Sequence, residues 1–160
     1  MARAREIPGL SGGMSMREAA ARTIEVRTRE VFEHASGVLD TSDIERVHDM
    51  RVATRRLRAA LEVFEPSFPK REFKRSLRDV KELADALGGR RDPDVALAAV
   101  EQIADSLGNP ERAGINSFIG ELRADQAVGN RELEVALAEV VESQLESRLL
   151  ALAGLARVPA

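Results

Sequence analysis

The spacing of apolar residues is the feature that most constrains the fold of this 160-residue chain. Between residues 42 and 65, mostly apolar positions recur three and four apart, which places them on one side of a helix: Val47, Met50, Thr54, Leu57, Leu61 and Phe64. A second seam with the same spacing consists of Phe73, Leu77, Val80, Ala84 and Leu87. No segment shows the apolar and polar alternation of a strand, so we expect an all-α fold.

Start and stop signals divide the chain into about six helices. Ser15 with Glu18 and Ser42 with Glu45 have the spacing of capping boxes, which predicts helices over 19–34 and 42–65. Pro66 and Pro69 end the second of these, and the third is expected from Lys70 to Leu87, stopping at Gly88-Gly89.

Two Pro-containing pairs predict further helix starts. Asp92-Pro93 and Asn109-Pro110 each combine an N-cap residue with Pro at the first helical position, and a hinge is expected at Gly129-Asn130. The remaining helices then cover about 93–108, 110–127 and 130–155. Short connections favour an antiparallel up-and-down bundle, formed as one domain by residues 14–160 behind a loose N-terminal tail at 1–13.

The net charge of −3 hides a strong internal asymmetry. Residues 46–91 carry 13 Lys and Arg against 7 Asp and Glu, a net charge of +6. The rest of the chain has 11 basic and 20 acidic residues, a net charge of −9. Positive charge concentrated in one segment attracts anions even when the whole chain is negative.

The basic residues of this segment form two stripes beside the apolar seams. Each cation follows a seam position by one residue, or about 100° of helix rotation: His48, Arg51, Arg55 and Arg58 in the first helix, and Lys74, Arg78 and Lys81 in the second. If two antiparallel helices pack seam to seam, stripes with the same offset emerge on the same side. We therefore expect a basic groove suited to a chain of phosphates, which Arg binds with its guanidinium fork.

Two alternatives remain open for these stripes. The cations could form an ordinary solvated face, neutralised by Asp49, Glu62, Asp79 and Glu82. The chain could instead be a helical adaptor or dimerisation protein whose acidic last helices dock a partner through an apolar face: Leu133, Leu137, Val140, Val141, Leu145 and Leu149. That face could equally complete the core.

Two segments resemble the CHAD family, the conserved histidine α-helical domains: 47-VHDMRVATRRLRAALEVF-64 and 77-LRDVKELADALGGRRDPDV-95. The resemblance is close over residues 42–95 and implies four-helix bundles around a basic channel that binds inorganic polyphosphate, without catalysis or cofactors. Carried over by motif, it implies binding roles for His48, Arg51, Arg55, Arg56 and Arg58, and for Lys81, Arg91 and the structural residue Asp92. The stripe pattern adds Lys74 and Arg78.

The chain departs from the family pattern in its second half. The resemblance implies a second basic motif there, yet residues 101–147 hold ten acids and only Arg112, Arg123 and Arg131. The chain therefore looks like half a channel, and a symmetric homodimer would place two basic grooves face to face.

Several classes of protein and site fit the sequence poorly. With no cysteine there is neither a disulfide framework nor a thiolate metal site, and we expect no metal site and a cytoplasmic location. No apolar run is long enough to cross a bilayer. Hydrolysis of phosphates would need converging carboxylates that the basic segment lacks. Nucleic acid stays open as a rival ligand, although no aromatic residues interleave the stripes to stack bases.

Overall fold

A computed structural model describes residues 3–158, apart from the side chains of residues 109 and 110. It contains five α-helices and one turn of 3-10 helix: α1 (Met16–Glu33), α2 (Ile44–Val63), η1 (Glu65–Ser67), α3 (Lys70–Ala104), α4 (Asn109–Glu142) and α5 (Leu145–Ala156). The described residues include no strand. The predicted all-α class is confirmed, with five α-helices in place of six.

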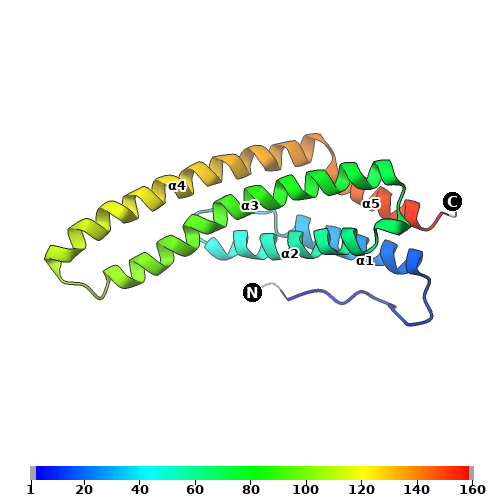
Figure 1. Cartoon of the computed structure of the whole chain (residues 1–160), viewed down its shortest axis with the longest axis horizontal. Coiled ribbons are helices and arrows are strands. Elements are labelled where there is room, and N and C mark those ends of the chain that lie inside the picture. Colours follow the sequence, from blue (N-terminus) through cyan, green and yellow to red (C-terminus); the bar gives the residue numbers. More distant parts are fainter. Residues whose placement is uncertain (1–2, 159–160) are drawn as a thin grey trace.

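The helices run up and down and fall into two regions (Figure 1). A bundle is formed by α1, α2, the first half of α3, the second half of α4 and the last helix α5, with α1 packed against both α2 and α5. The second half of α3 and the first half of α4 project from this bundle as a two-helix hairpin. The antiparallel prediction is therefore confirmed, but the projecting hairpin was not foreseen.

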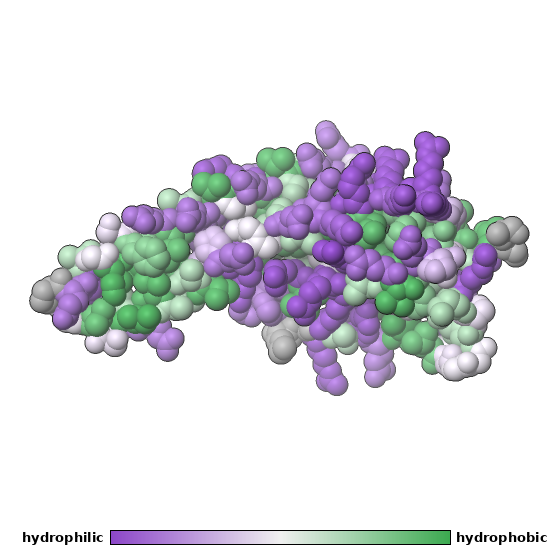
Figure 2. Space-filling model, viewed as in Figure 1, coloured by the Kyte–Doolittle hydropathy of each residue, from purple (hydrophilic) through white to green (hydrophobic). Residues whose placement is uncertain are grey.

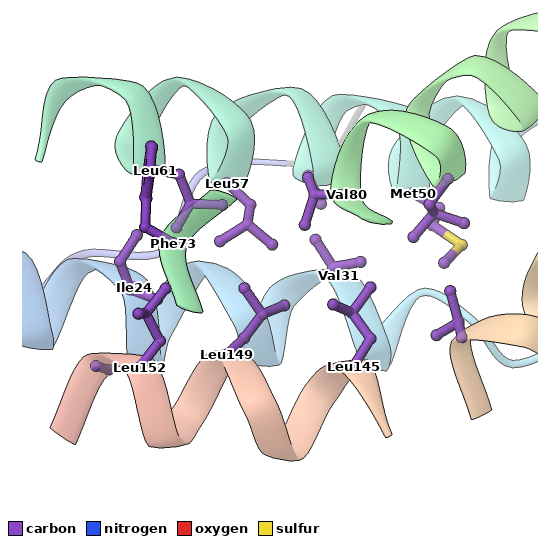
Figure 3. Packing of buried hydrophobic residues seen from close by; sticks show 14 of the residues in the cluster. Ile24, Val31, Met50, Leu57, Leu61, Phe73, Val80, Leu145, Leu149 and Leu152 are labelled. Carbon is purple, nitrogen blue, oxygen red and sulfur yellow. The ribbon is translucent and has the colours of Figure 1, made fainter. Parts of the chain in front are cut away.

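The main core lies inside the bundle, where all five α-helices contribute apolar side chains, α4 through Leu133 and Val140 near its end. Figure 3 shows the part of this core that α1, α2, α3 and α5 form. The labelled residues are at most 2% exposed: Ile24, Val31, Met50, Leu57, Leu61, Phe73, Val80, Leu145, Leu149 and Leu152. Each such side chain stabilises the fold by about 1.5–3 kcal/mol through burial. Most of both predicted seams lies here, so the spacing of three and four identified the core-facing sides of α2 and α3.

The two predicted capping boxes differ in outcome. Ser15 caps α1 as expected, since its Oγ accepts a hydrogen bond from the Glu18 backbone N–H at 3.2 Å. Ser42 does not cap α2, which begins at Ile44 after Asp43. Instead the Ser42 hydroxyl donates to Asp40 Oδ1 at 2.7 Å and its backbone N–H donates to the same atom at 2.9 Å. This local turn takes the serine away from the helix start.

The predicted break between residues 88 and 93 is wrong, because α3 runs unbroken from Lys70 to Ala104 with Pro93 inside it. Tertiary contacts explain this continuity. Arg90 and Asp94 form a fully buried ion pair that spans Pro93, and the Arg90 Nε donates to Asn130 Oδ1 of α4 at 3.0 Å. Packing against α4 therefore overrides the local helix-breaking tendency of Gly and Pro.

The hinge expected at Gly129-Asn130 is also absent, and α4 continues to Glu142. Gly129 serves close packing, because a Cβ there would lie 2.8 Å from the backbone O of Gly89 in α3. The chain breaks at Gln144 instead, whose φ of 52° and ψ of 43° are left-handed. Arg148 supports this turn, since its Nε donates to the Ser143 carbonyl at 2.8 Å.

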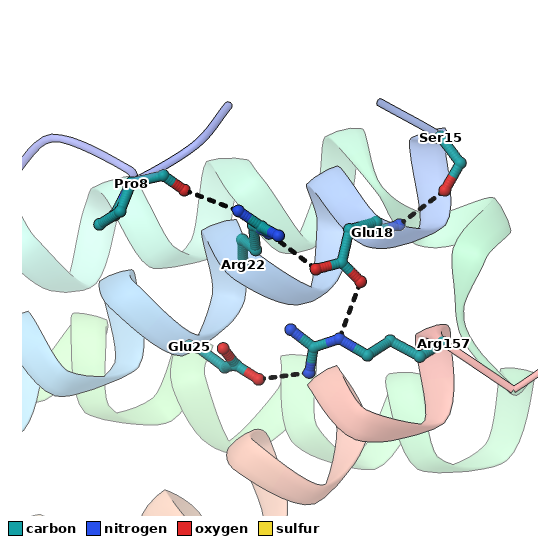
Figure 4. A network of polar contacts seen from close by, with 6 residues as sticks. All are labelled: Pro8, Ser15, Glu18, Arg22, Glu25 and Arg157. Carbon is teal, nitrogen blue, oxygen red and sulfur yellow. Dashed lines mark hydrogen bonds and ion pairs between the residues drawn. The ribbon is translucent and has the colours of Figure 1, made fainter. Parts of the chain in front are cut away.

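The segment before α1 and the residue after α5 both contact side chains of α1 (Figure 4). Arg157, just after α5, bridges Glu18 at 2.9 Å and Glu25 at 2.5 Å. Arg22 links Glu18 to the N-terminal segment by donating to the Pro8 carbonyl at 3.1 Å. Hydrogen bonds from Arg157 first, and then Arg22, hold the pKa of the Glu18 carboxyl below its ordinary value of 4.5.

Candidate binding site

The α2 stripe follows one side of the helix next to its buried seam. Arg51, Arg55 and Arg58 lie four and three residues apart, so they fall in a line along α2. Arg55 is exposed, whereas Arg51 and Arg58 are half-buried. Burial of the neighbouring Met50, Thr54 and Leu57 fixes this orientation, because the seam cannot leave the core without exposing those side chains.

Glu62 joins the two stripes across the contact between α2 and α3. Its Oε1 lies 3.1 Å from the Nε of Arg58 on the same helix and 3.7 Å from the Nζ of Lys81 on α3. One carboxylate therefore reaches cations from both helices. Lys74 lies seven residues before Lys81 and hence on the same side of α3.

Three cations of the stripes lack a neutralising group. In the part of the chain that the structure describes, Arg51, Arg55 and Lys74 make no ion pair and no side-chain hydrogen bond. We call the set formed by His48, Arg51, Arg55, Arg58, Lys74 and Lys81 the basic surface.

Arg78 and Arg56 point elsewhere. Arg78 lies between Lys74 and Lys81 in the same line of α3, but its 66% exposed side chain pairs with Asp79 at 3.1 Å and Glu82 at 3.8 Å and lines a hollow against α4. For this residue the solvated-face interpretation describes the contacts well. Arg56 lies one residue past Arg55, or about 100° further around α2, and therefore outside the line of the stripe.

Arg91 and Asp92 occupy different sides of α3. The Nη1 of Arg91 donates to the Ile44 carbonyl at 3.0 Å, and its Nη2 lies 3.6 Å from Glu45, so this 15% exposed side chain holds the first turn of α2. Asp92 was expected to cap a fourth helix. It lies instead within α3, exposed, beside a hollow between α3 and α4.

His48 lies among acids as well as cations. One ligand atom from each of Glu45, His48 and Asp49 falls within 4.8 Å of the others, the closeness that a bound metal ion requires. This group was not foreseen from sequence. The Nη2 of Arg91 lies 3.6 Å from the Glu45 carboxylate and competes with a metal ion for it.

Two residues that follow Lys81 on the same side of α3 were not part of the predicted stripe. Gly88 lies seven residues after Lys81 on the same side, and a Cβ there would meet open space. Asp85 lies four residues after Lys81, exposed and without an ion-pair partner in the described chain. The row of basic side chains on α3 therefore ends at Lys81. The net charge of residues 46–91 did not reveal this limit.

The apolar face proposed for partner docking by the last helices mostly completes the core. Leu133, Leu145 and Leu149 are 0% exposed and Val140 is 8% exposed, while Val141 alone of the set points outward at 76%. No described helix is both long and apolar enough to traverse a bilayer.

A family model described as the CHAD domain matches residues 22–160, which includes all of the basic surface. The search of curated proteins found no match.

Proposed function

The chain belongs to the CHAD domain family, and from this membership we propose that it is a non-catalytic module that binds inorganic polyphosphate on its basic surface. The proposed contacts are His48, Arg51, Arg55, Arg58, Lys74 and Lys81, with Arg56, Arg78 and Arg91 at the periphery.

The unpaired state of Arg51, Arg55 and Lys74 carries this proposal. Like charges on neighbouring helices repel one another, and here a single carboxylate, Glu62, is shared by the cations of both helices. A polyanion supplies the missing negative charge. Phosphate oxygens also match the guanidinium fork, which can donate two parallel hydrogen bonds.

The spacing suits a linear ligand better than a single phosphate. Arg51, Arg55 and Arg58 are separated by four and three residues, or about 6 and 5 Å along the helix axis. A chain laid along α2 therefore meets successive cations. Lys74 and Lys81 extend the contact onto α3, where their flexible stems provide adjustable point charges.

The test is a calorimetric titration with polyphosphate of defined length. We expect the double variant Arg51→Ala/Arg55→Ala to weaken binding at least about tenfold and to flatten its salt dependence, because fewer counterions are released. The matched control is Arg29→Ala/Arg131→Ala, which removes two exposed and unpaired arginines from α1 and α4. If both variants lost the same affinity for polyphosphate, only net charge would matter, and the proposed binding site would be contradicted.

Three further measurements separate the rival functions. Competition between polyphosphate and single-stranded RNA at physiological salt decides which polyanion is preferred. Incubation with polyphosphate and Mg²⁺ followed by chain-length analysis tests the non-catalytic assignment, which release of phosphate would contradict. Sedimentation with and without polyphosphate tests the homodimer that would pair two basic surfaces.

A further inference from the structure

The hairpin that projects from the bundle has a small core of its own. Four residues, Leu97, Ala104, Ile119 and Leu122, form a separate apolar cluster, and each keeps 4–9% of its surface exposed. Figure 2 shows hydrophobic residues over much of the visible side of this hairpin, whereas long hydrophilic side chains gather over the bundle. A hairpin of two helices can bury only the sides that face each other, so its flanks stay available to a further element.

On one flank of the hairpin, two acids at the end of α3 pair with arginines of α4. Glu101 of α3 accepts a hydrogen bond from Arg123 of α4 at 2.9 Å, and Asp105 accepts one from Arg112 at 3.2 Å. Each of these two acids therefore has a cation from the neighbouring helix.

The other flank holds a hollow whose acids are unmatched. Its lining includes the apolar residues Ala96, Leu122 and Val128 and the exposed acids Asp92, Asp125 and Glu132. Within residues 3–158 none of these three carboxylates has an ion-pair partner. We call this surface the acidic-rimmed hollow. On the opposite flank of the same two helices, acids are paired with arginines of the chain. The unpaired acids of the hollow are therefore suited to cations that another molecule supplies.

Apolar side chains continue this surface toward the tip of the hairpin. Ile103 lies seven residues after Ala96, and Phe118 lies four residues before Leu122, so both fall on the flank of the hollow. They are 54% and 48% exposed, and Val128 is 44% exposed. The combination is an apolar strip bordered by carboxylates.

A second copy of the chain fits this strip poorly. A two-fold contact places the same patch of both copies face to face. The carboxylates of Asp92, Asp125 and Glu132 from both copies would then share one interface, and like charges brought together repel. The occupant must bring apolar groups and positive charge together.

We propose that the acidic-rimmed hollow docks an amphipathic helix of another protein, with an apolar face flanked by Lys and Arg. A third helix lying between α3 and α4 would cover Ile103, Phe118 and Val128 and pair its cations with the three rim acids. This recognition follows the pattern of a helix in a groove, where apolar anchors supply affinity and charges set selectivity. The site is separate from the basic surface and does not depend on polyphosphate binding.

The test uses a fluorescein-labelled peptide of about 15 residues with leucines three and four positions apart and lysines elsewhere, measured by anisotropy at physiological salt. We expect Asp92→Asn/Asp125→Asn/Glu132→Gln to weaken binding at least about tenfold. The matched control Glu134→Gln/Glu142→Gln/Glu146→Gln removes three exposed, unpaired acids elsewhere and should change binding less than about twofold.

A second pair of variants tests the apolar floor without threatening the fold. Val128→Asn should weaken the lysine peptide, whereas Val141→Asn, at a valine that is 76% exposed near the end of α4, should not. A peptide with glutamate in place of lysine should fail to bind. The proposal is overturned if both acid triples weaken binding equally, or if sedimentation shows a wild-type dimer that the rim triple dissociates, which would make a second copy the occupant.

Discussion

Asp85 limits the basic surface at the level of a single residue. It lies on the same side of α3 as Lys81, four residues further on, and has no ion-pair partner in the described chain. A phosphate chain passing Lys81 would meet this carboxylate and be repelled. We expect Asp85→Asn to tighten polyphosphate binding by about two- to fivefold at low salt, and less at high salt because exposed charges are screened.

Calorimetry at two salt concentrations measures this gain. Glu134→Gln on α4 is the control, because it changes the net charge equally at an exposed acid away from the basic surface. An equal gain in both variants would assign the effect to net charge and leave Asp85 without a local role.

The buried Arg90 and Asp94 pair makes a prediction about stability. Both side chains are 0% exposed, and Gln126 of α4 donates to Asp94 Oδ1 at 2.7 Å. Asp94→Ala would leave a buried guanidinium uncompensated, so we expect it to lower the free energy of unfolding by about 3–5 kcal/mol. Arg123→Ala breaks an exposed pair and should cost less than about 1 kcal/mol. Urea denaturation measures both, and similar losses would contradict the structural role of the buried pair.

Spacing was enough to predict the stripes on α2 and α3, because the one-residue offset from a buried seam fixes where a helical side chain points. It could not predict which cations remain unpaired. Arg78 turns to Asp79 and Glu82, and Arg91 reaches the carbonyl of Ile44, 47 residues earlier in the chain. Such partners depend on rotamers and on contacts between distant segments.

At the level of helices, two glycines predict opposite effects of the same substitution. A Cβ at Gly88 meets open space, so Gly88→Ala should raise the free energy of unfolding by up to about 1 kcal/mol through helix propensity. A Cβ at Gly129 would lie 2.8 Å from the backbone O of Gly89 and 3.1 Å from the Cα of Arg90, so Gly129→Ala should be destabilising. Thermal and urea unfolding of the two variants provide the comparison, and stabilisation by both would contradict the close approach of α3 and α4.

The same glycines explain why the helix boundaries were only partly predictable. Gly88-Gly89, Asp92-Pro93 and Gly129-Asn130 resemble turns when neighbouring residues alone are considered. In the fold, Gly129 packs on Gly89, and Asn130 contacts Arg90 of α3 and the Leu39 carbonyl. The actual break at Gln144 has neither Gly nor Pro beside it and relies on Arg148. Helix-breaking residues can therefore mark packing sites between helices.

At the scale of the whole molecule, Arg157 after α5 pairs with Glu18 and Glu25 of α1, a contact that we call the clasp. The clasp predicts a dependence of stability on pH. The pKa of Glu18 is lowered in the fold by Arg157 and Arg22, so its contribution is present above the ordinary value of 4.5 and is lost as the pH falls through the lowered pKa. We expect Glu18→Gln to have a lower Tm than the wild type at pH 7 and the same Tm at strongly acid pH. The control Glu134→Gln should match the wild type throughout, and a pH-independent difference for Glu18→Gln would contradict the clasp.

The projecting hairpin should open more readily than the bundle. Its separate core has four buried residues, each still 4–9% exposed, whereas α1 and α5 bury Ile24, Leu145 and Leu149 completely. Segments with few buried apolar contacts unfold locally at low free-energy cost. In hydrogen exchange, amides of residues 95–104 and 115–126 should therefore exchange at least about tenfold faster than those of 20–31 and 145–153.

Polyphosphate should slow exchange in the bundle without protecting the hairpin, because the basic surface lies on α2 and the first half of α3. Uniform exchange across all five helices would mean that the hairpin and the bundle unfold as one unit, with the buried Arg90 and Asp94 network joining them more strongly than their apolar cores suggest.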